Sequence, residues 1–312
     1  MPKPNQKIMP ENIISADEFL QQSGLKSFVR NPLAGDASHR RYERILTSDK
    51  SYMLMIAPPG KEDVRPFIKV DSILRDANLH APEIYSQNPE SGYLLLEDMG
   101  DDLFSRVLVT NNNELELYKM AVEVLAVLPK TADLPEYSTE KLVEESALFI
   151  DWFAVDAPRE EFTAIITKLV EQLDKKHNKL VLRDYHADNL IWLPQEQNLH
   201  KVGLLDFQDA VIGHEAYDLV SLLEDARRDV SKETTTKILQ GRSMDFMRDY
   251  FILGAQRNLK IIGIFNRLKK RDNKDNYLKF LPRVWNHLKH DLEHPAMAEL
   301  KGWMNKYNLL PE

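Results

Sequence analysis

The sequence contains no cysteine among its 312 residues. Disulfide bonds, thiolate zinc sites and cysteine nucleophiles are therefore excluded, and the absence fits the reducing cytoplasm, where we expect this protein. Long apolar runs are missing as well. No stretch reaches the about 18 residues of a membrane span, and the N-terminus lacks the apolar segment of a signal peptide. We therefore expect no association with a membrane.

An excess of positive charge is also missing. Lysine and arginine number 41 against 49 aspartate and glutamate residues, which gives a formal net charge of −8. A nucleic-acid partner is not expected, because phosphate neutralisation needs clustered Lys and Arg. The same balance is compatible with ATP, which arrives as a magnesium complex. No feature of the sequence indicates an obligate protein partner.

The first hundred residues predict a small sheet. Residues 27–56 contain three short strand patterns, and Val64–Leu79 has the apolar spacing of a helix. Two more strands follow at 83–86 and 93–96. Because these runs are too short and too close for parallel crossovers, we expect a mostly antiparallel sheet.

Helical patterns dominate after Gly100, and among them we expect separate helices at 232–251 and 252–271. The sequence thus predicts an α+β fold with two lobes. The lobes are an N-lobe of residues 1–98, built on the sheet and binding the nucleotide, and a mostly helical C-lobe of residues 99–312, carrying the catalytic loop and the acceptor site.

Three polar residues have the spacing of a phosphoryl-transfer site. Asp184 is followed five residues later by Asn189, at the start of an apolar strand, and 22 residues after Asp184 comes Asp206, at the end of another. Phosphoryl transfer needs one carboxylate beside the attacking hydroxyl, and an amide and a second carboxylate that hold metal on the phosphates. The arrangement matches the catalytic-loop Asp, loop Asn and metal Asp of kinases.

Further segments carry a family resemblance: Gly35–Tyr42, Ala57–Pro59, Glu62–Phe67, Leu94–Asp102, Leu182–Asn189, Leu204–Ala210, Tyr217–Leu223, Asp225–Asp229, Gln256–Arg257 and Ile262–Phe265. In these segments the chain resembles the aminoglycoside phosphotransferase and choline kinase branch of the protein-kinase-like superfamily. More narrowly, it is similar to the bacterial kinases that phosphorylate N-acetylmuramate and N-acetylglucosamine at C1. The resemblance spans residues 25 to 290.

The resemblance implies a role for each matching residue. Asp184 would be the catalytic base, and Asn189 and Asp206 would hold Mg²⁺ on ATP. The segment Leu95–Met99 would be the hinge that binds adenine, and Gly35–Ser38 would lie over the phosphates. The residues expected to bind the nucleotide are Gly35, Asp36, Ala37, Ser38, Arg40, Arg41, Leu96, Glu97 and Met99.

One position departs from the kinase pattern. Kinases carry a Lys on the third strand that pairs with the phosphates, and here the matching residue is Met55. Arg40 or Arg41 could replace that charge. Neighbouring residues on a strand point to opposite faces, so only one of the two can do so, and the sequence does not decide which. Asp71 is a possible replacement for the helix Glu that normally pairs with the Lys.

The expected acceptor is an amino sugar, phosphorylated on its anomeric hydroxyl. The lactyl carboxylate of muramate would need a cation, for which Arg227, Arg228 and Arg257 are candidates, and Asp209 could reach a sugar hydroxyl. The structural alternatives are a turn residue for Asp209 and helix-end ion pairs with Asp225 and Asp229 for Arg227 and Arg228. We expect His186 to be a packed or hydrogen-bonded histidine, Asp188 to cap or brace the loop and Arg183 to brace it. Asp218 is expected to cap or anchor the helix near Tyr217.

Two other functions stay open. The same motifs serve kinases of aminoglycosides, choline or homoserine, and a polycationic aminoglycoside would need an acidic pocket where muramate would need a basic one. A nucleotide-binding pseudokinase is the second alternative, and the missing strand Lys is its only support.

Overall fold

The computed structural model describes residues 13–33, 39–110 and 113–311. The chain divides into two compact units. The first unit contains residues 1–101 and the short segment 203–208, and the second contains residues 102–202 and 209–312.

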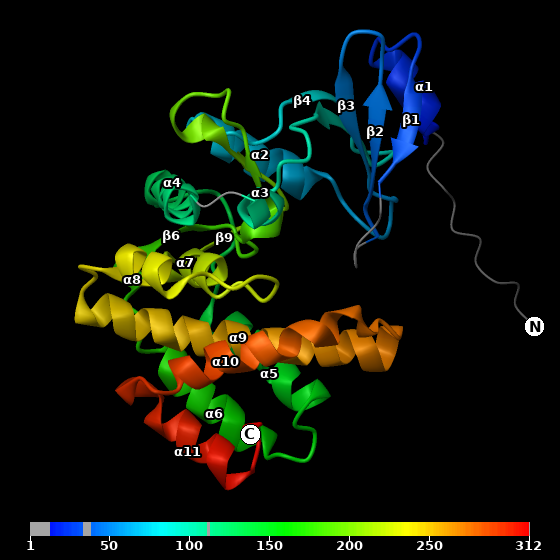
Figure 1. The fold of residues 1–312 in the computed structure, drawn as a ribbon. Helices are drawn as coiled ribbons and strands as arrows, with labels where there is room; N and C mark the ends of the chain where they lie inside the picture. Colours follow the sequence, from blue (N-terminus) through cyan, green and yellow to red (C-terminus); the bar gives the residue numbers. More distant parts are fainter. Residues whose placement is uncertain (1–12, 34–38, 111–112, 312) are drawn as a thin grey trace, which may run out of the picture. The chain divides into compact units, whose positions relative to one another are not determined.

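The first unit is built on a five-stranded sheet in the order β1-β2-β3-β5-β4 (Figure 1). All neighbouring strands are antiparallel, which confirms the predicted sheet. Each strand lies within two residues of its predicted bounds. The strands are β1 (Val29–Pro32), β2 (Arg41–Leu46), β3 (Ser51–Ile56), β4 (Ile84–Asn88) and β5 (Tyr93–Glu97).

Two helices accompany this sheet, α1 (Ala16–Gln22) and α2 (Arg65–Asp76). The side chain of Ser15 caps α1 by accepting the backbone N–H of Glu18. Phe19 of α1 belongs to one buried cluster with Leu54 and Leu95 of the central strands. Burial of such side chains is the main stabilising term in the unit.

The segment 203–208 belongs to the first unit and contacts it on both sides of Asp206. Phe207 packs on Phe67 of α2 with 4.7 Å between ring centroids. The N–H of Leu204 donates to the carbonyl of His80 at 2.9 Å. These contacts fix the backbone on both sides of Asp206, so that a residue distant in sequence lies within the sheet unit.

The second unit is mostly helical. Its helices are α3 (Phe104–Thr110), α4 (Glu114–Val127), α5 (Thr139–Trp152), α6 (Arg159–Val170), α7 (Ala216–Leu223), α8 (Lys232–Leu239), α9 (Met244–Asp272), α10 (Leu281–Asp291) and α11 (Ala298–Lys306). Short 3-10 turns lie at Lys175–His177, Ala187–Asn189, Asn198–Lys201, Asp275–Phe280 and Pro295–Met297. The strands β6 (Asn178–Val181) and β9 (Val211–His214) pair antiparallel. The remaining strands are β7 (Leu190–Trp192) and β8 (Val202–Leu204), and β8 runs from this unit into the first.

The predicted division between residues 251 and 252 is wrong, because α9 continues without interruption from Met244 to Asp272. The helix break comes earlier, where Gly241 has a φ of 81° and Ser243 caps α9 by accepting the N–H of Phe246. The glycine adopts a left-handed conformation that other residues disfavour.

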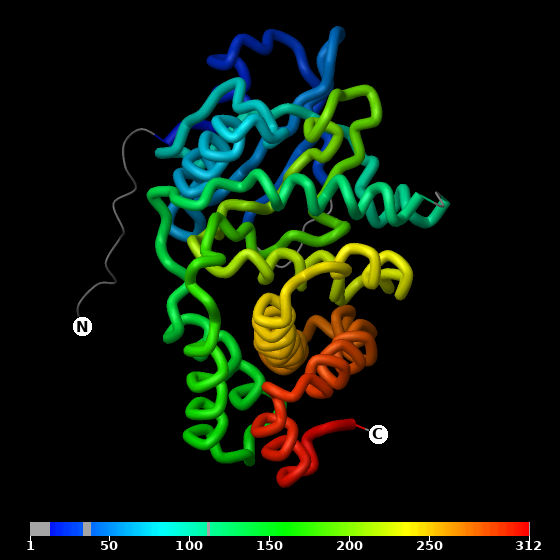
Figure 2. The backbone as a smooth tube through the Cα atoms, turned by 90° about the vertical axis from the view of Figure 1, so that its left-hand side faces the viewer, coloured from blue at the N-terminus to red at the C-terminus, as the bar shows by residue number. Residues whose placement is uncertain are grey.

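The long helix α9 packs against both α5 and α10 (Figures 1 and 2). The approach to α5 is close, since a Cβ added to Gly263 would lie 2.3 Å from the carbonyl carbon of Leu148. Among the described residues, no helix has both the length and the apolar character needed to cross a membrane.

Candidate active site

The catalytic-loop segment follows β6 in the second unit, and Asp218 of α7 holds its backbone. One carboxylate oxygen of Asp218 accepts the N–H of Leu182 at 2.6 Å, and the other accepts that of Arg183 at 2.8 Å. Arg183 has a φ of 73°, a left-handed conformation that costs a non-glycine residue about 1–3 kcal/mol. The two hydrogen bonds offset this strain. Asp218 thus supports the loop before Asp184 in addition to lying on its own helix.

Asp184 and Asn189 lie in the same loop. The Asn189 side-chain amide donates from Nδ2 to the carbonyl oxygen of Asp184 at 2.9 Å. This bond orients the amide. The side chain that the sequence predicted as a metal ligand is therefore hydrogen-bonded to the backbone of the predicted base.

Positive charges from α9 act on Asp184. Burial raises the pKa of Asp184, but Lys260 and Arg257 outweigh this effect and hold the pKa below its ordinary value. The Asp184 side chain is nevertheless exposed to solvent, although many protein atoms surround it. Because this side chain is exposed, an acceptor can reach the carboxylate. Water also screens part of the effect of Lys260 and Arg257 on the pKa of Asp184. An ionised and accessible carboxylate is what a general base requires.

A buried ion network lies beside this loop. Lys260 Nζ is 2.7 Å from Glu145 Oε2, and Arg183 Nη2 is 2.5 Å from Glu145 Oε1. The hydroxyl of Tyr137 also donates to Glu145. Sequence reasoning missed Glu145 and Lys260. The sequence signal for both was a charged residue at a helix position where the apolar pattern predicts a buried side chain.

His186 joins the catalytic loop to the segment after α7. Its Nε2 lies 3.2 Å from Arg227 Nη1 and 3.4 Å from Asn189 Nδ2. Both neighbours are donors, so Nε2 must be the acceptor and the ring carries its proton on Nδ1. Burial lowers the pKa of His186, in agreement with a neutral ring. His186 is thus a buried, hydrogen-bonded histidine, as expected from the sequence.

Asp206 lies in the first unit beside Arg40. The Asp206 side chain is 47% exposed, and its Oδ1 lies 3.7 Å from Arg40 Nη1. Gln208 Nε2 donates to the same oxygen at 2.9 Å. Arg41 is exposed on β2. Of the two candidate arginines, Arg40 is therefore the one that approaches Asp206. The predicted phosphate loop, residues 35–38, lies outside the described residues.

The hinge candidates span the end of β5, with Leu96 and Glu97 inside the strand and Met99 two residues beyond it. Leu96 and Met99 are buried, and Glu97 accepts the N–H of Glu83 at 3.1 Å and lies 3.2 Å from His80 Nε2. On β3, Met55 is buried between Tyr42 and Leu94 of the flanking strands, so the strand has no lysine at this position.

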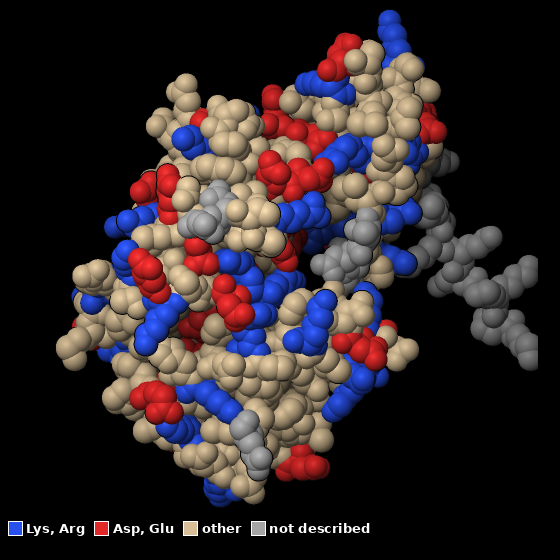
Figure 3. Space-filling view, viewed as in Figure 1, with Lys and Arg blue, Asp and Glu red and all other residues tan. Residues whose placement is uncertain are grey.

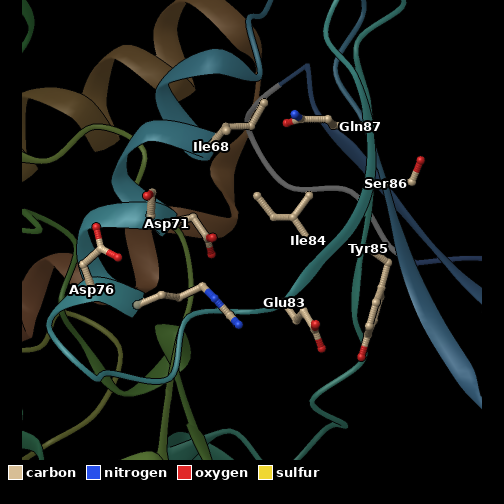
Figure 4. A pocket seen from close by; sticks show the side chains of 10 residues that line it. Ile68, Asp71, Asp76, Glu83, Ile84, Tyr85, Ser86 and Gln87 are labelled. Carbon is tan, nitrogen blue, oxygen red and sulfur yellow. The ribbon is translucent and has the colours of Figure 1, made fainter.

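Asp71 of α2 forms no ion pair with another described residue, and burial raises its pKa to about 7. It lines a cavity of about 470 Å³ between α2 and β4 (Figure 4). Glu83 lies across this space. Asp184, Asn189 and Asp206 are not among the residues that line this cavity.

The predicted acceptor residues lie in different surroundings in the second unit. Arg227 and Arg228 line a cavity of about 610 Å³ next to Asp188. Figure 3 shows Lys and Arg atoms beside the loop that follows α7, with Asp and Glu atoms among them. Arg257 is buried and donates from Nη2 to Ser221 Oγ at 2.8 Å. Asp209 is exposed, and its carbonyl accepts from Arg183 at 3.4 Å.

Comparison with known proteins decides the family. Residues 29–250 match the phosphotransferase enzyme family. The chain belongs to this family. The prediction of a phosphotransferase is therefore confirmed. A protein of Caulobacter vibrioides named N-acetylmuramate/N-acetylglucosamine kinase is 34% identical over 93% of this chain and 94% of its own length. A protein of Pseudomonas aeruginosa with the same name is 36% identical over 86% of each chain.

Solved structures confirm the fold of this phosphotransferase. The choline kinase LicA from Streptococcus pneumoniae has a TM-score of 0.65 and 15% identity, over 88% of this chain and 98% of its own. An ADP-bound aminoglycoside phosphotransferase has a TM-score of 0.59 and 14% identity, over 88% and 97%. The predicted kinase-like α+β fold is thus confirmed.

Proposed function

We propose that this phosphotransferase uses ATP to phosphorylate the anomeric hydroxyl of N-acetylmuramate, N-acetylglucosamine or both, giving the sugar 1-phosphate. The observation that carries the proposal is the relatives' shared name. Four proteins named N-acetylmuramate/N-acetylglucosamine kinase are 31–36% identical over 82–93% of this chain. In the cytoplasm the product would feed the recycling of cell-wall precursors.

We assign Asp184 as the general base. The anomeric hydroxyl gives its proton to the Asp184 carboxylate while its oxygen bonds to the γ-phosphorus, and the bond to the β-phosphate oxygen breaks to release ADP. A hemiacetal hydroxyl is more acidic than an ordinary alcohol, so an aspartate with a lowered pKa is an adequate base. Such assistance is typically worth about 10²–10⁴-fold in rate.

We assign Asn189 and Asp206 as ligands of Mg²⁺. Among the described residues, no three acidic or histidine side chains are grouped closely enough to hold a metal without other ligands. An amide oxygen and one carboxylate suit a magnesium ion that takes its other ligands from phosphates and water. Bound there, the ion would neutralise charge on the phosphate oxygens.

Arg40 is our candidate for the cation that replaces the strand lysine, because it approaches Asp206 while Arg41 is exposed. The backbone of Leu95–Met99 would bind adenine, and residues 35–38 would cover the phosphates. In this assignment residues 1–98 form the nucleotide lobe and residues 99–312 the acceptor lobe.

We assign the acceptor to the cavity of about 610 Å³, because Arg227 in its wall lies 3.2 Å from His186 of the catalytic loop, and the charge of this cavity bears on the rival substrates. Three arginines, Arg227, Arg228 and Arg283, line it together with two aspartates, Asp188 and Asp229. With one more arginine than aspartate, this set suits a neutral or acidic sugar better than a polycationic aminoglycoside. The pseudokinase alternative gains nothing from the structure, since the loop holds Asp184 exposed with Asn189 bound to it.

The test is ATP consumption by the purified protein with Mg²⁺ and, separately, N-acetylmuramate, N-acetylglucosamine, kanamycin and choline. Phosphorus NMR then identifies the product. We expect a sugar 1-phosphate signal with one or both amino sugars, and none with Asp184→Asn. Turnover of kanamycin or choline alone would reject the sugar assignment and keep the kinase chemistry. ATP binding without turnover of any acceptor would favour a pseudokinase.

A further inference from the structure

The cavity of about 610 Å³ in the second unit combines apolar walls with a concentration of arginine. Leu108 and Val109 of α3 line it, as does Phe280 just before α10. The arginines come from two places, Arg227 and Arg228 from the loop after α7 and Arg283 from α10. A space of this size suits one small molecule with apolar faces and an anionic group.

Arg283 already holds a carboxylate in this cavity. Its Nε lies 2.6 Å from Asp229 Oδ1 and its Nη2 lies 2.8 Å from Asp229 Oδ2, a bidentate arrangement. The remaining nitrogen, Nη1, donates to the carbonyl of Ala226 at 2.9 Å, which fixes the plane of the guanidinium. Two donors thus point in fixed directions at a carboxylate.

The carboxylate that Arg283 holds is replaceable. The side chain of Asp229 is 81% exposed, whereas that of Arg283 is 24% exposed. Ion pairs with such an exposed partner contribute little to stability, about 0–1 kcal/mol, because water solvates the released carboxylate well. A ligand carboxylate can therefore take the place of Asp229 on Arg283 at low cost.

The other two arginines differ in their contacts. Arg228 lies 2.9 Å from Glu114 and donates to the Tyr118 hydroxyl at 3.0 Å, so a half-buried carboxylate already neutralises it. The Arg227 side chain makes longer contacts, 3.3 Å to Asp188 and 3.2 Å to His186. Arg227 is therefore better placed than Arg228 to accept a second contact from a ligand.

We propose that Arg283 and Arg227 form a carboxylate subsite through which the enzyme prefers an acidic acceptor sugar to a neutral one. The inference rests on the proposed function. The two candidate sugars differ by one lactyl ether group, which adds a single carboxylate. A guanidinium matches a carboxylate with two parallel hydrogen bonds, which gives direction as well as charge. Arg227 also contacts His186, so the subsite adjoins the catalytic loop.

The experiment compares kcat/KM for N-acetylmuramate and N-acetylglucosamine in the wild type and in Arg283→Gln, Arg283→Lys and Arg227→Gln. We expect the ratio of acidic to neutral sugar to fall about 10–100-fold in the Gln variants, the usual worth of a hydrogen bond to a charged group. Arg283→Lys keeps the charge but not the two parallel N–H donors, so its ratio should lie between those of the wild type and Arg283→Gln. Arg271→Gln, an exposed arginine at the end of α9 outside the cavity, is the matched control.

Asp229→Asn gives a test that loss of folding cannot imitate. It removes the carboxylate that competes for Arg283, so KM for the acidic sugar should fall severalfold while KM for the neutral sugar changes less. Equal losses on both sugars in the Gln variants, or a higher KM for the acidic sugar in Asp229→Asn, would overturn the subsite alone. A wild type inactive on both sugars would overturn the proposed function with it.

Discussion

Lys260 Nζ lies 2.7 Å from Glu145 Oε2, an ion pair that connects α9 to α5 beside the catalytic loop. The side chains are 13% and 9% exposed. Glu145 also binds Arg183, the residue before the proposed base. The pair is therefore both a part of the helical core and a support for the catalytic loop.

Replacing Glu145 and replacing Lys260 should lower the free energy of unfolding by different amounts. Glu145→Gln leaves Lys260 and Arg183 as buried, adjacent cations, and we expect the free energy of unfolding to fall by about 3–5 kcal/mol. Lys260→Met leaves Glu145 paired with Arg183, so a smaller loss of about 1–3 kcal/mol is expected. Urea unfolding measures both. The exposed Lys270→Met on the same helix is the control and should stay within about 0.5 kcal/mol. Equal losses in the two variants would contradict this account.

Variants of Asp184 and Asp218 should distinguish a role in catalysis from a role in stabilising the catalytic loop. Asp184→Asn should lower kcat by about 10²–10⁴-fold. The free energy of unfolding should fall by no more than about 1 kcal/mol, because solvent exposure screens the attraction of Lys260 and Arg257 that lowers its pKa. Asp218→Asn should lower both quantities, since an amide can accept only one of the two backbone N–H bonds that Asp218 receives. Steady-state kinetics and urea unfolding on the same preparations distinguish the two. An Asp218→Asn protein with wild-type stability would show that these bonds do not support the loop.

The sheet could be predicted because local chemistry determines it. Strands such as Tyr52–Ile56 are bounded by turn residues, and short connections leave only antiparallel pairing. The break in the long helix was misplaced because residues 232–271 have one continuous helical pattern. The deciding signals, Gly241 and the capping Ser243, occupy only a few positions within it.

Sequence spacing identified Asp184 and Asn189 because both belong to one short loop. It could not identify Glu145, Lys260 or Arg283, which reach the loop or the cavity from α5, α9 and α10. Such residues are separated along the chain by up to 138 positions and are brought together only by helix packing. The charge of a single helical residue does not reveal which residue of another helix its side chain will contact.

Arg40 and Arg41 provide a matched pair for testing the replacement of the strand lysine. The side chain of Arg40 is 14% exposed and approaches Asp206, while Arg41 is exposed on β2. We expect Arg40→Ala to raise KM for ATP about 10-fold or more, the worth of one charged hydrogen bond, and Arg41→Ala to change it less than about 3-fold. Initial rates over a series of ATP concentrations measure this. The reverse order would assign the phosphate contact to Arg41.

Two buried carboxyl groups predict a pH-dependent stability. Glu224 at the end of α7 and Asp291 at the end of α10 both accept from Asn258 Nδ2, at 2.7 and 2.9 Å. Tyr250 and Arg257 also face Glu224. Burial raises the pKa of Glu224 to about 7, and burial together with the neighbouring Glu224 raises that of Asp291.

The sign of the effect follows from these raised pKa values. Below about pH 4 both folded and unfolded chains keep the proton on Glu224, so its contribution to stability is fully present. As the pH rises to 7 the unfolded chain ionises while the folded one does not, so stability is lost, in total roughly 3 kcal/mol. Glu224→Gln should reduce this loss, since it cannot ionise in either state. Urea unfolding at several pH values between 4.5 and 7.5 measures the slope, with the exposed Glu171→Gln as control. A slope in Glu224→Gln equal to that of the control would show that Glu224 is ionised in the folded protein, with Asn258 and Arg257 outweighing its burial.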